Sequence, residues 1–373
     1  MKKILVFVDS FHTGGITEVV KHIYRRLDRT KYEMSFLRCD GGPRDFDEEI
    51  EKNGDKVYII TKEQLPKVPV INYSILTKRM VKKIRNAVGN DKYDVAYIHS
   101  NAFFCVPGAK ALGIKKIIMH VHEAVSDFGG NEEKSAITKL IWKRRQRMYN
   151  RLASYKVGVS KKACIAKFGE NVVNDKKMRV IHPSVDTEKF DPDRYDKDSI
   201  AKEFSVDEAA FNMIHVGRLF AVKNQAFMLD ILKEISKIRK CHLYIIYIGS
   251  VEMNNLVNKA KALGVYDMVT FLPGNTTAGL YKLMNCSLLP SFSESFGMVA
   301  VESQMMNVPC FASTNVPDDV DVGLCVHLPL EDGAKAWADK ILNYDYENAR
   351  LDEEKAKEFT IECIIKKTEK LFD

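Results

Sequence analysis

Short apolar runs alternate with helix-like segments along most of this chain, and this alternation restricts the possible folds more than any other feature. The runs are as long as buried strands, and segments such as 73–88 carry apolar residues at helical spacing. In the first half the runs are 34–37, 57–60, 95–98 and 116–119. Strands that alternate with helices are typical of βαβ units, so the pattern predicts an α/β fold with parallel sheets and right-handed crossovers.

The chain is too long for one core of this kind. It has 373 residues, whereas a single hydrophobic core stops growing at roughly 250–300 residues. We therefore expect two domains. The second half repeats the alternation, with apolar runs at 211–216, 242–248, 268–272 and 286–289. A loop follows each run, which predicts a second parallel sheet.

The loop after the last of these strands combines an acidic residue with a glycine. Residues 291–297 read Ser-Phe-Ser-Glu-Ser-Phe-Gly, and a helix-like segment containing Glu302 follows. In parallel α/β sheets, ligands bind outside the carboxyl ends of the strands, where helix N-termini offer backbone N–H groups. Glu294 and Glu302 could accept hydrogen bonds from hydroxyl groups at opposite ends of one polyhydroxylated ligand, and Gly297 allows close approach of the backbone. An incidental acidic pair on a solvated helix is the alternative.

Two cations follow the first strand of the second half. Residues 217–224 read Gly-Arg-Leu-Phe-Ala-Val-Lys-Asn, between the strand at 211–216 and a helix that begins at Gln225. Arg218 can bind phosphate oxygens through two N–H groups at once, and Lys223 can add a point charge. Because the start of a helix already favours anions, the loop is a candidate phosphate site. Basic surface residues beside a turn are the alternative.

These two stretches resemble the donor site of retaining glycosyltransferases, most closely those of family 4. Glu294 and Glu302, with seven residues between them, are similar to the Glu-x7-Glu signature, and Arg218 and Lys223 match the diphosphate-binding stretch. The resemblance implies the GT-B architecture, in which two Rossmann-like domains face each other across a deep cleft. It implies an acceptor domain at 1–186, a donor domain at 187–355 and a terminal helix at 356–373 that crosses back to the first domain.

The resemblance also implies roles for single residues. Arg218 and Lys223 would stabilise the departing diphosphate, Glu294 would hold the donor sugar and Glu302 the ribose. No metal, cofactor or covalent nucleophile is implied. The implied catalytic residues are Glu294, His122, Arg218 and Lys223. The implied donor-binding residues are Gly14, Gly15, Arg218, Lys223, Leu272, Glu294, Phe296, Gly297, Met298 and Glu302.

A pair of glycines, Gly14 and Gly15, follows the first strand of the chain. Such a loop between a strand and a helix often means that the backbone approaches a ligand, although a simple tight turn is the alternative. The sequence is not the G-x-G-x-x-G fingerprint of dinucleotide-binding enzymes. The main sequence evidence for a dehydrogenase is therefore absent. The resemblance to family 4 implies that this loop lies beneath the sugar diphosphate.

Two histidines, His120 and His122, end the strand at 116–119. Alternation along a strand puts both side chains on one face, near the end where ligands bind. They could be metal ligands, but no third ligand lies at a recognisable spacing. They could instead be structural or face the substrate, and the resemblance places His122 against the donor sugar.

A basic segment at 134–152 has apolar residues on one helical stripe, namely Ile137, Ile141, Met148 and Leu152. The remaining surface carries Lys139, Lys143, Arg144, Arg145, Arg147 and Arg151. A second basic cluster lies at 78–85. Both surfaces could simply be solvated, or they could contact anionic lipid, which would suit an enzyme with a lipid-linked acceptor.

Net charge and apolar content limit the partners and the location. A net charge of +7 suggests an anionic partner, for which nucleotide diphosphates, nucleic acid and anionic lipid all qualify. No apolar run approaches the roughly 18 residues of a membrane span, and Asp9 follows the first strand too early for a signal peptide. We therefore expect a cytoplasmic protein. The eight cysteines form no C-x-x-C pair, so buried reduced thiols are expected.

With the resemblance to family 4, these observations predict a retaining glycosyltransferase. It would move a sugar from a nucleotide-diphosphate donor, expected to be a UDP-sugar, to a glycan or lipid-linked acceptor in surface polysaccharide synthesis. A GT-B-type sugar-nucleotide epimerase is the alternative, and it would convert the donor without an acceptor. A nucleic-acid partner is not expected, because basic and aromatic residues do not interleave in any recognised motif. The sequence does not identify the sugar, the base or the acceptor.

Overall fold

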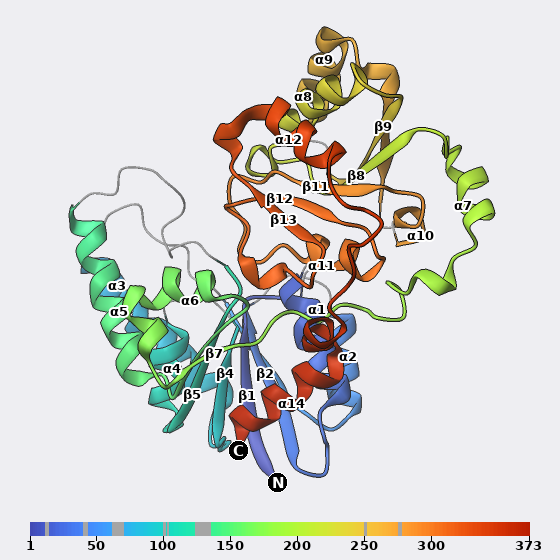
Figure 1. Cartoon of the computed structure of the whole chain (residues 1–373). Coiled ribbons are helices and arrows are strands. Elements are labelled where there is room, and N and C mark those ends of the chain that lie inside the picture. Colours follow the sequence, from blue (N-terminus) through green and yellow to red (C-terminus); the bar gives the residue numbers. More distant parts are fainter. Residues whose placement is uncertain are drawn as a thin grey trace. The chain divides into compact units, whose positions relative to one another are not determined.

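Two parallel β-sheets, each flanked by helices, organise the chain in a computed structural model (Figure 1). The structure describes residues 1–11, 15–39, 44–61, 71–99, 102, 104–123, 136–249, 252–274 and 278–373. Unit 1 comprises Met1–Pro183 and Ile361–Asp373, and unit 2 comprises Ser184–Thr360. The sequence analysis placed domain limits after residues 186 and 355. The predicted α/β class with parallel sheets is confirmed.

The sheet of unit 1 has the strand order β3-β2-β1-β4-β5-β6-β7 among the described residues, and all neighbouring strands are parallel. The side chains of β1 from Ile4 to Val8 are all buried. This explains why the strand is a continuous apolar run, since both faces of the sheet are covered by helices. The strands are β1 (Lys2–Val8), β2 (Tyr32–Cys39), β3 (Val57–Ile60), β4 (Val95–Ile98), β5 (Lys116–Val121), β6 (Tyr155–Gly158) and β7 (Met178–Val180).

Helices cover both faces of this sheet. The helices α1 (Gly15–Arg26), α2 (Asp45–Lys52) and α14 (Ile361–Phe372) pack on one face, where Ile23, Phe46 and Phe372 share a core with β1, β2 and β4. The other side, to the left in Figure 1, holds α3 (Ile71–Val88), α4 (Cys105–Ala111), α5 (Ala136–Leu152) and α6 (Lys161–Phe168). Ser160 caps α6, because its hydroxyl accepts a hydrogen bond from Ala163 N at 3.1 Å.

The sheet of unit 2 has the order β10-β9-β8-β11-β12-β13 among the described residues, again entirely parallel. Its strands are β8 (Phe211–Arg218), β9 (Cys241–Ile248), β10 (Val269–Pro273), β11 (Cys286–Leu289), β12 (Cys310–Ser313) and β13 (Cys325–Leu328). Its helices are α7 (Lys197–Phe204), α8 (Gln225–Ser236), α9 (Met253–Leu263), α10 (Ala278–Tyr281), α11 (Met298–Met305), α12 (Gly333–Leu342) and α13 (Glu353–Ala356). The core lies between the sheet and α8, α9 and α12, around the fully buried Trp337.

The C-terminal segment differs from the expected continuous helix. Helix α13 ends at Ala356, a 3-10 turn spans Lys357–Phe359, and α14 begins only at Ile361. The interruption has a tertiary cause. Phe359 O accepts a hydrogen bond from Val185 N at 2.9 Å, whereas in a continuous helix it would accept one from the next helical turn. After the break, α14 packs in unit 1, where the ring of Phe372 contacts those of Tyr32 and Tyr97.

The cysteines and the surface are ordinary for a globular protein. All eight cysteines lie in the described ranges and are free thiols, and six of them are buried, as the sequence predicted.

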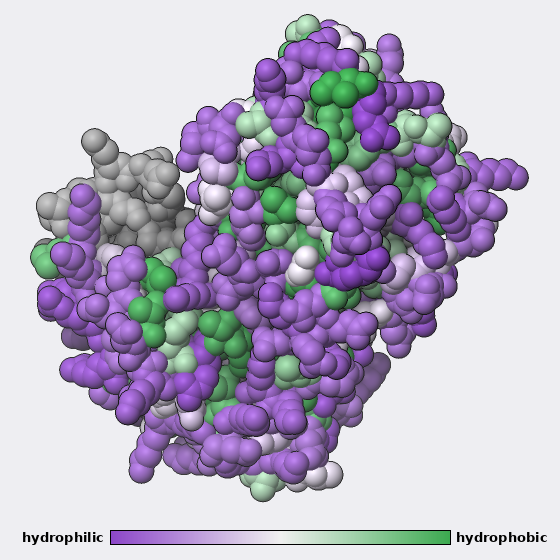
Figure 2. All heavy atoms as spheres, in the orientation of Figure 1, coloured by the Kyte–Doolittle hydropathy of each residue, from purple (hydrophilic) through white to green (hydrophobic). Residues whose placement is uncertain are grey.

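The face seen in Figure 2 is mainly hydrophilic, with apolar side chains scattered across it. In the part of the chain that the structure describes, no helix is long and apolar enough to cross a membrane.

Candidate functional site

The strand order of unit 2 reverses between β8 and β11. After β8 the chain continues to β9 on one side, whereas β11 lies on the other side of β8. The loops that leave these two neighbouring strands therefore diverge from one edge of the sheet, which is where open α/β sheets bind ligands. The loop after β8 contains Lys223, β8 itself ends in Arg218, and the loop after β11 contains Glu294. The topology thus brings together the two stretches that the sequence analysis selected.

Lys223 and Glu294 form an ion pair across these loops. Lys223 Nζ lies 2.5 Å from Glu294 Oε1, and the side chains are only 19% and 10% exposed. Ser291 Oγ donates a second hydrogen bond to the same carboxylate oxygen at 2.8 Å. Among the described residues, nothing donates to Glu294 Oε2. The carboxylate is therefore held in place while one oxygen remains able to accept a hydrogen bond from a ligand.

Backbone contacts fix the two loops to each other. Phe292 N donates to Val222 O at 2.8 Å, which joins the residues next to the ion pair. Ser313 Oγ, at the end of β12, donates to Ser291 O at 2.5 Å. The Glu294 loop is therefore supported from both sides of β11, and the position of the carboxylate depends on three neighbouring strands.

The buried His215 helps to hold the backbone at Arg218 in place. His215 Nδ1 donates to Leu288 O at 2.9 Å, and His215 Nε2 lies 3.3 Å from Gln225 Nε2. Burial lowers the pKa of His215 to about 4, so the ring is neutral and Nε2 accepts from the Gln225 amide. The same amide donates to Arg218 O at 2.8 Å. This chain of contacts fixes the backbone from which Arg218 projects.

Arg218 itself is exposed at the end of β8. Its guanidinium lies 5.0 Å from the centre of the Phe220 ring, a stacking contact that leaves the N–H groups at the edge of the guanidinium. Within the described part of unit 2, no carboxylate pairs with it. Arg218 therefore remains available for an anion, whereas Lys223 is already paired.

Glu302 occupies the second turn of α11, without a hydrogen bond to Glu294, Arg218 or Lys223 among the described residues. Burial raises its pKa to about 7, against a smaller opposing effect of Lys189. The Glu302 charge in turn contributes to raising the pKa of the buried Tyr281. The carboxyl group is therefore partly protonated near pH 7, and a ligand that donates hydrogen bonds to it would favour the ionised form.

Gly297 is required by the backbone and by packing. Its φ is +110°, and a Cβ at this position would lie 3.3 Å from both Leu289 Cδ2 and Val316 Cγ1. Any other residue would be strained there. Phe296 is buried, with its ring 5.8 Å from that of Phe359. These contacts place the first turn of α11, which begins at Met298, directly after the Glu294 loop.

The remaining predicted residues lie elsewhere. Leu272 is half-buried on β10, the strand at the edge of the unit 2 sheet. Gly15 opens α1 after β1, beside the point where the unit 1 strand order reverses. Gly14 lies outside the described residues.

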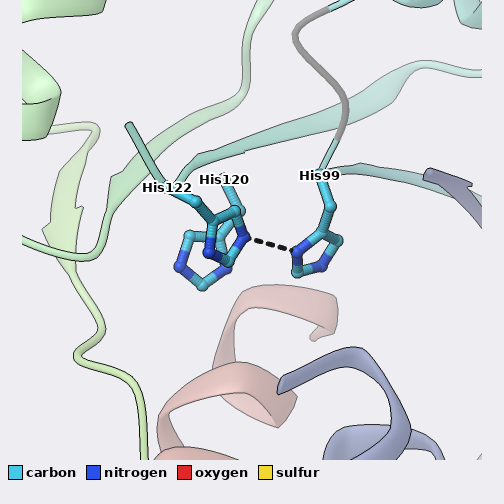
Figure 3. A group of neighbouring side chains, drawn as sticks. All are labelled: His99, His120 and His122. Atoms are coloured by element: carbon cyan, nitrogen blue, oxygen red, sulfur yellow. Dashed lines mark hydrogen bonds between the residues drawn. The ribbon is translucent and has the colours of Figure 1, made fainter. Parts of the chain in front are cut away.

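His122 of unit 1 is part of a cluster of three histidines (Figure 3). His99 follows β4, His120 lies in the adjacent β5 and His122 follows it. His99 Nδ1 lies 2.8 Å from His122 Nε2, and His120 Nδ1 lies 2.7 Å from the hydroxyl of Tyr97. Burial lowers the pKa of His120 to about 4 and those of the other two well below 6.5. All three rings are therefore neutral at pH 7.

Two family models match this chain. The model described as Glycosyltransferase Family 4 matches residues 13–189, and the model described as Glycosyl transferases group 1 matches residues 196–318. The two matches follow one another along the chain and cover most of both units. The chain belongs to glycosyltransferase family 4.

Known proteins are similar over the whole length of this glycosyltransferase. The EpsF protein of Bacillus subtilis (strain 168), which is assigned as a glycosyltransferase, is 26% identical over 352 residues, covering 91% of this chain and 87% of EpsF. The solved structure of Anabaena Alr3699/HepE in complex with UDP has a TM-score of 0.72 at 19% identity, covering 100% and 99% of the two chains. A glycosyltransferase from Rickettsia africae has a TM-score of 0.73 at 15% identity, covering 100% and 97%. These neighbours confirm the GT-B fold class.

Sequence reasoning missed two parts of this glycosyltransferase. The His215–Gln225 support was missed because a buried polar pair in a strand and a helix has no spacing that distinguishes it from ordinary core residues. His99 was missed because it lies 23 positions before His122 in sequence. The parallel pairing of β4 and β5 gives the signal that could have found it, since both residues come directly after neighbouring strands. The sequence showed no third ligand at a recognisable spacing, and the structure supplies one in His99.

Proposed function

We propose that this glycosyltransferase moves a sugar from a UDP-sugar to a glycan or lipid-linked acceptor in the cytoplasm, with retention at the anomeric carbon, as part of surface polysaccharide synthesis. The observation that carries the proposal is the convergence of Lys223, Ser291 and Glu294 at the switch point of unit 2. The UDP and UDP-glucose complexes of Anabaena HepE, with TM-scores of 0.72 and 0.69, support a UDP-sugar as donor. In this proposal unit 2 binds the donor and unit 1 the acceptor.

The basic residues would stabilise the leaving group. Breaking the glycosyl–phosphate bond leaves negative charge on the diphosphate and positive charge on the sugar, so fixed charges near the phosphates lower the barrier. The exposed Arg218 would bind phosphate oxygens through two N–H groups. Lys223 has three N–H donors and can contact a phosphate while it keeps Glu294 in place. With these two cations, the proposed transfer requires no metal or other cofactor.

The acidic residues would bind hydroxyl groups of the donor. Glu294 Oε2 would accept from the sugar, together with the backbone N–H groups that follow Phe296 at the start of α11. Glu302 would accept from the ribose hydroxyls in its ionised form. Backbone groups near Leu272 would contact the base.

Retention would follow from attack on the same face of the sugar that the diphosphate leaves. The acceptor hydroxyl would form the new bond to the anomeric carbon as the glycosyl–phosphate bond breaks. Its proton would pass to an oxygen of the departing diphosphate, so no covalent intermediate with the enzyme is proposed. His122 would orient the donor sugar from unit 1.

Binding of the donor nucleotide gives the first test. We expect UDP to raise the melting temperature more than GDP or ADP, because a ligand present at 100 times its Kd adds about 2.7 kcal/mol to the free energy of unfolding. Incubation with UDP-glucose and other UDP-sugars, with and without a lipid-linked oligosaccharide extract, should then show UDP release that depends on the extract. Isomerised donor formed without any acceptor would support the epimerase instead. No shift with any nucleoside diphosphate would refute the donor site.

A basic surface on unit 1 supports a further part of the proposal, peripheral contact with anionic lipid. Helices α3 and α5 lie on the same side of the sheet (Figure 1), and neither contains an aspartate or glutamate. Their exposed basic residues are Lys78, Arg79, Lys82 and Arg85 of α3 and Lys139, Lys143, Arg144, Arg147 and Arg151 of α5. Ile75 is 47% exposed and Leu140 is 58% exposed. Exposed apolar side chains among exposed cations suit the interface of an anionic membrane, where a lipid-linked acceptor would be found.

A further inference from the structure

The histidine cluster of unit 1 has the composition of a metal site. One ring nitrogen from each of His99, His120 and His122 lies within 4.8 Å of the other two. The residues come from the ends of two adjacent parallel strands, β4 and β5, so rigid elements hold their backbones. Figure 3 shows the three rings gathered in one place, with His99 facing the other two.

Two of these rings carry nitrogen atoms with unused bonding capacity. His99 Nε2 and His120 Nε2 are buried and make no hydrogen bond of normal geometry among the described residues, although the backbone carbonyl of Ile181 lies near enough to the His120 ring to raise its pKa against the larger lowering by burial. Buried polar atoms are normally paired, and exceptions call for an explanation such as an ion. Tyr97 Oη, 2.7 Å from His120 Nδ1, can accept the Nδ1 proton. The lone pair of His120 is then on Nε2, as in metal-bound histidines whose other ring nitrogen donates to an oxygen.

We propose that His99, His120 and His122 bind one Zn²⁺ ion and leave its fourth coordination position open. Three neutral imidazoles suit Zn²⁺, whereas Mg²⁺ and Ca²⁺ prefer oxygen ligands. Three protein ligands with one open position are a known zinc arrangement. Zn–N bonds of about 2.0–2.1 Å place tetrahedral nitrogens about 3.3 Å apart, so the rings must rotate closer together. The His99–His122 contact must open at the same time.

Zinc at this site would change catalysis in a way that rests on the proposed function. If His122 orients the donor sugar, a zinc ion bound to its ring takes that residue away from the substrate. Zn²⁺ would then inhibit sugar transfer without lowering UDP binding to unit 2. The ion would be a regulator of the enzyme, which agrees with a transfer reaction that requires no metal.

Direct zinc binding by the full chain tests the site without any sugar substrate. The protein is first freed of metal with a chelator and then titrated with Zn²⁺ in a calorimeter, with a competing chelator to define the affinity. We expect one ion per chain, and an affinity at least about 100-fold lower in the His99→Gln and His120→Gln variants. His242→Gln is the matched control, because His242 is a half-buried histidine of unit 2 that contacts Thr270 Oγ1. Equal zinc affinity in all variants would overturn the proposal.

A spectroscopic measurement on the unchanged protein covers the case in which a variant does not fold. Co²⁺ in place of Zn²⁺ should give the visible d–d bands of an ion with three nitrogen ligands and a water molecule in the fourth position. The partly exposed thiols of Cys325 and Cys363 are the competing ligands, and they would instead give thiolate charge-transfer bands. Such bands, or loss of cobalt binding after alkylation of the thiols, would refute the histidine site. UDP binding, measured separately, shows whether the proposed function fails independently.

Discussion

Lys223 Nζ lies 2.5 Å from Glu294 Oε1, although 71 positions of sequence separate the two residues. The contact joins the loops of β8 and β11, and both side chains are mostly buried. Without a ligand, each charge offsets the desolvation of the other. A bound diphosphate would share Lys223 with Glu294, so this ion pair links the proposed phosphate site to the proposed sugar site.

Removing the lysine should therefore affect catalysis far more than removing a lysine from an ordinary surface pair. We expect Lys223→Ala to lower kcat/KM at least about 100-fold, since it removes a charge that stabilises the leaving group and frees the carboxylate of Glu294. Lys259→Ala is the control, because Lys259 pairs with Asp230 at 2.6 Å in the same unit. Steady-state UDP release measures both. Similar rates for the two variants would contradict the assignment.

Ser291 should matter through the position of Glu294. Ser291→Ala removes a hydrogen bond of 2.8 Å to a buried carboxylate and should lower the free energy of unfolding by about 1–3 kcal/mol. Because Glu294 then loses one of its two supports, we expect KM for the donor to rise several-fold while the fold is kept. Ser236→Ala, which removes an analogous hydroxyl contact to Lys233 O, should leave KM unchanged. Urea unfolding and initial-rate measurements test the two parts separately.

Glu302 should make stability depend on pH. Its pKa is raised from 4.5 to about 7 in the folded chain, so between these values the folded state keeps a proton that the unfolded state has released. Stability therefore falls as pH rises from 4.5 to 7, and the loss is complete above 7. We expect Glu302→Gln to remove this dependence and to raise the free energy of unfolding at pH 8 by about 1–3 kcal/mol. Urea titrations at pH 5 and pH 8 would show it.

The same carboxyl group gives an opposite expectation for ligand binding. If the ionised form accepts hydrogen bonds from the ribose, UDP affinity of the unchanged enzyme should increase as pH rises through 7. Glu302→Gln should bind UDP more weakly above pH 7 and lose that increase. A variant that is more stable yet binds UDP less well would separate the binding role from a structural one. Unchanged affinity at every pH would exclude Glu302 from the ribose site.

Much of the candidate site was predictable because ligand loops follow the ends of parallel strands. The resemblance to family 4 put the cations after one strand and the glutamate after another into one site, and the Lys223–Glu294 contact shows that the two loops meet. The two series of apolar runs, each alternating with helix-like segments, predicted two parallel sheets. Both sheets are present, so the local pattern was sufficient to predict them.

What could not be predicted depends on pairing between distant segments. The meeting of His99 with His122 requires knowing that β4 and β5 are neighbours, and the break before Ile361 requires the contact between Val185 and Phe359. Neither has a local sequence signal. The facing arrangement of the two domains and the roles of the site residues stay predictions.

The basic surface of α3 and α5 leads to a prediction about membranes. Replacing Lys143, Arg144 and Arg147 with glutamine removes three exposed charges from α5. Each basic residue near an anionic surface contributes about 1 kcal/mol, so the loss of three should lower partitioning onto phosphatidylglycerol vesicles roughly 100-fold. Sedimentation with vesicles measures the bound fraction, and added salt should weaken binding of the unchanged protein because exposed charges are screened.

A matched variant and a neutral membrane decide whether this binding is specific to the helix surface. Replacing Lys202, Lys237 and Lys240 with glutamine removes the same charge from exposed positions of unit 2. If net charge alone caused binding, both triple variants would lose it equally, and the helix surface would have no special role. If the surface of α3 and α5 is the contact, the unit 2 variant should bind like the unchanged chain. Neutral phosphatidylcholine vesicles should then bind neither, because the exposed Ile75 and Leu140 are too few to hold the protein without charge attraction.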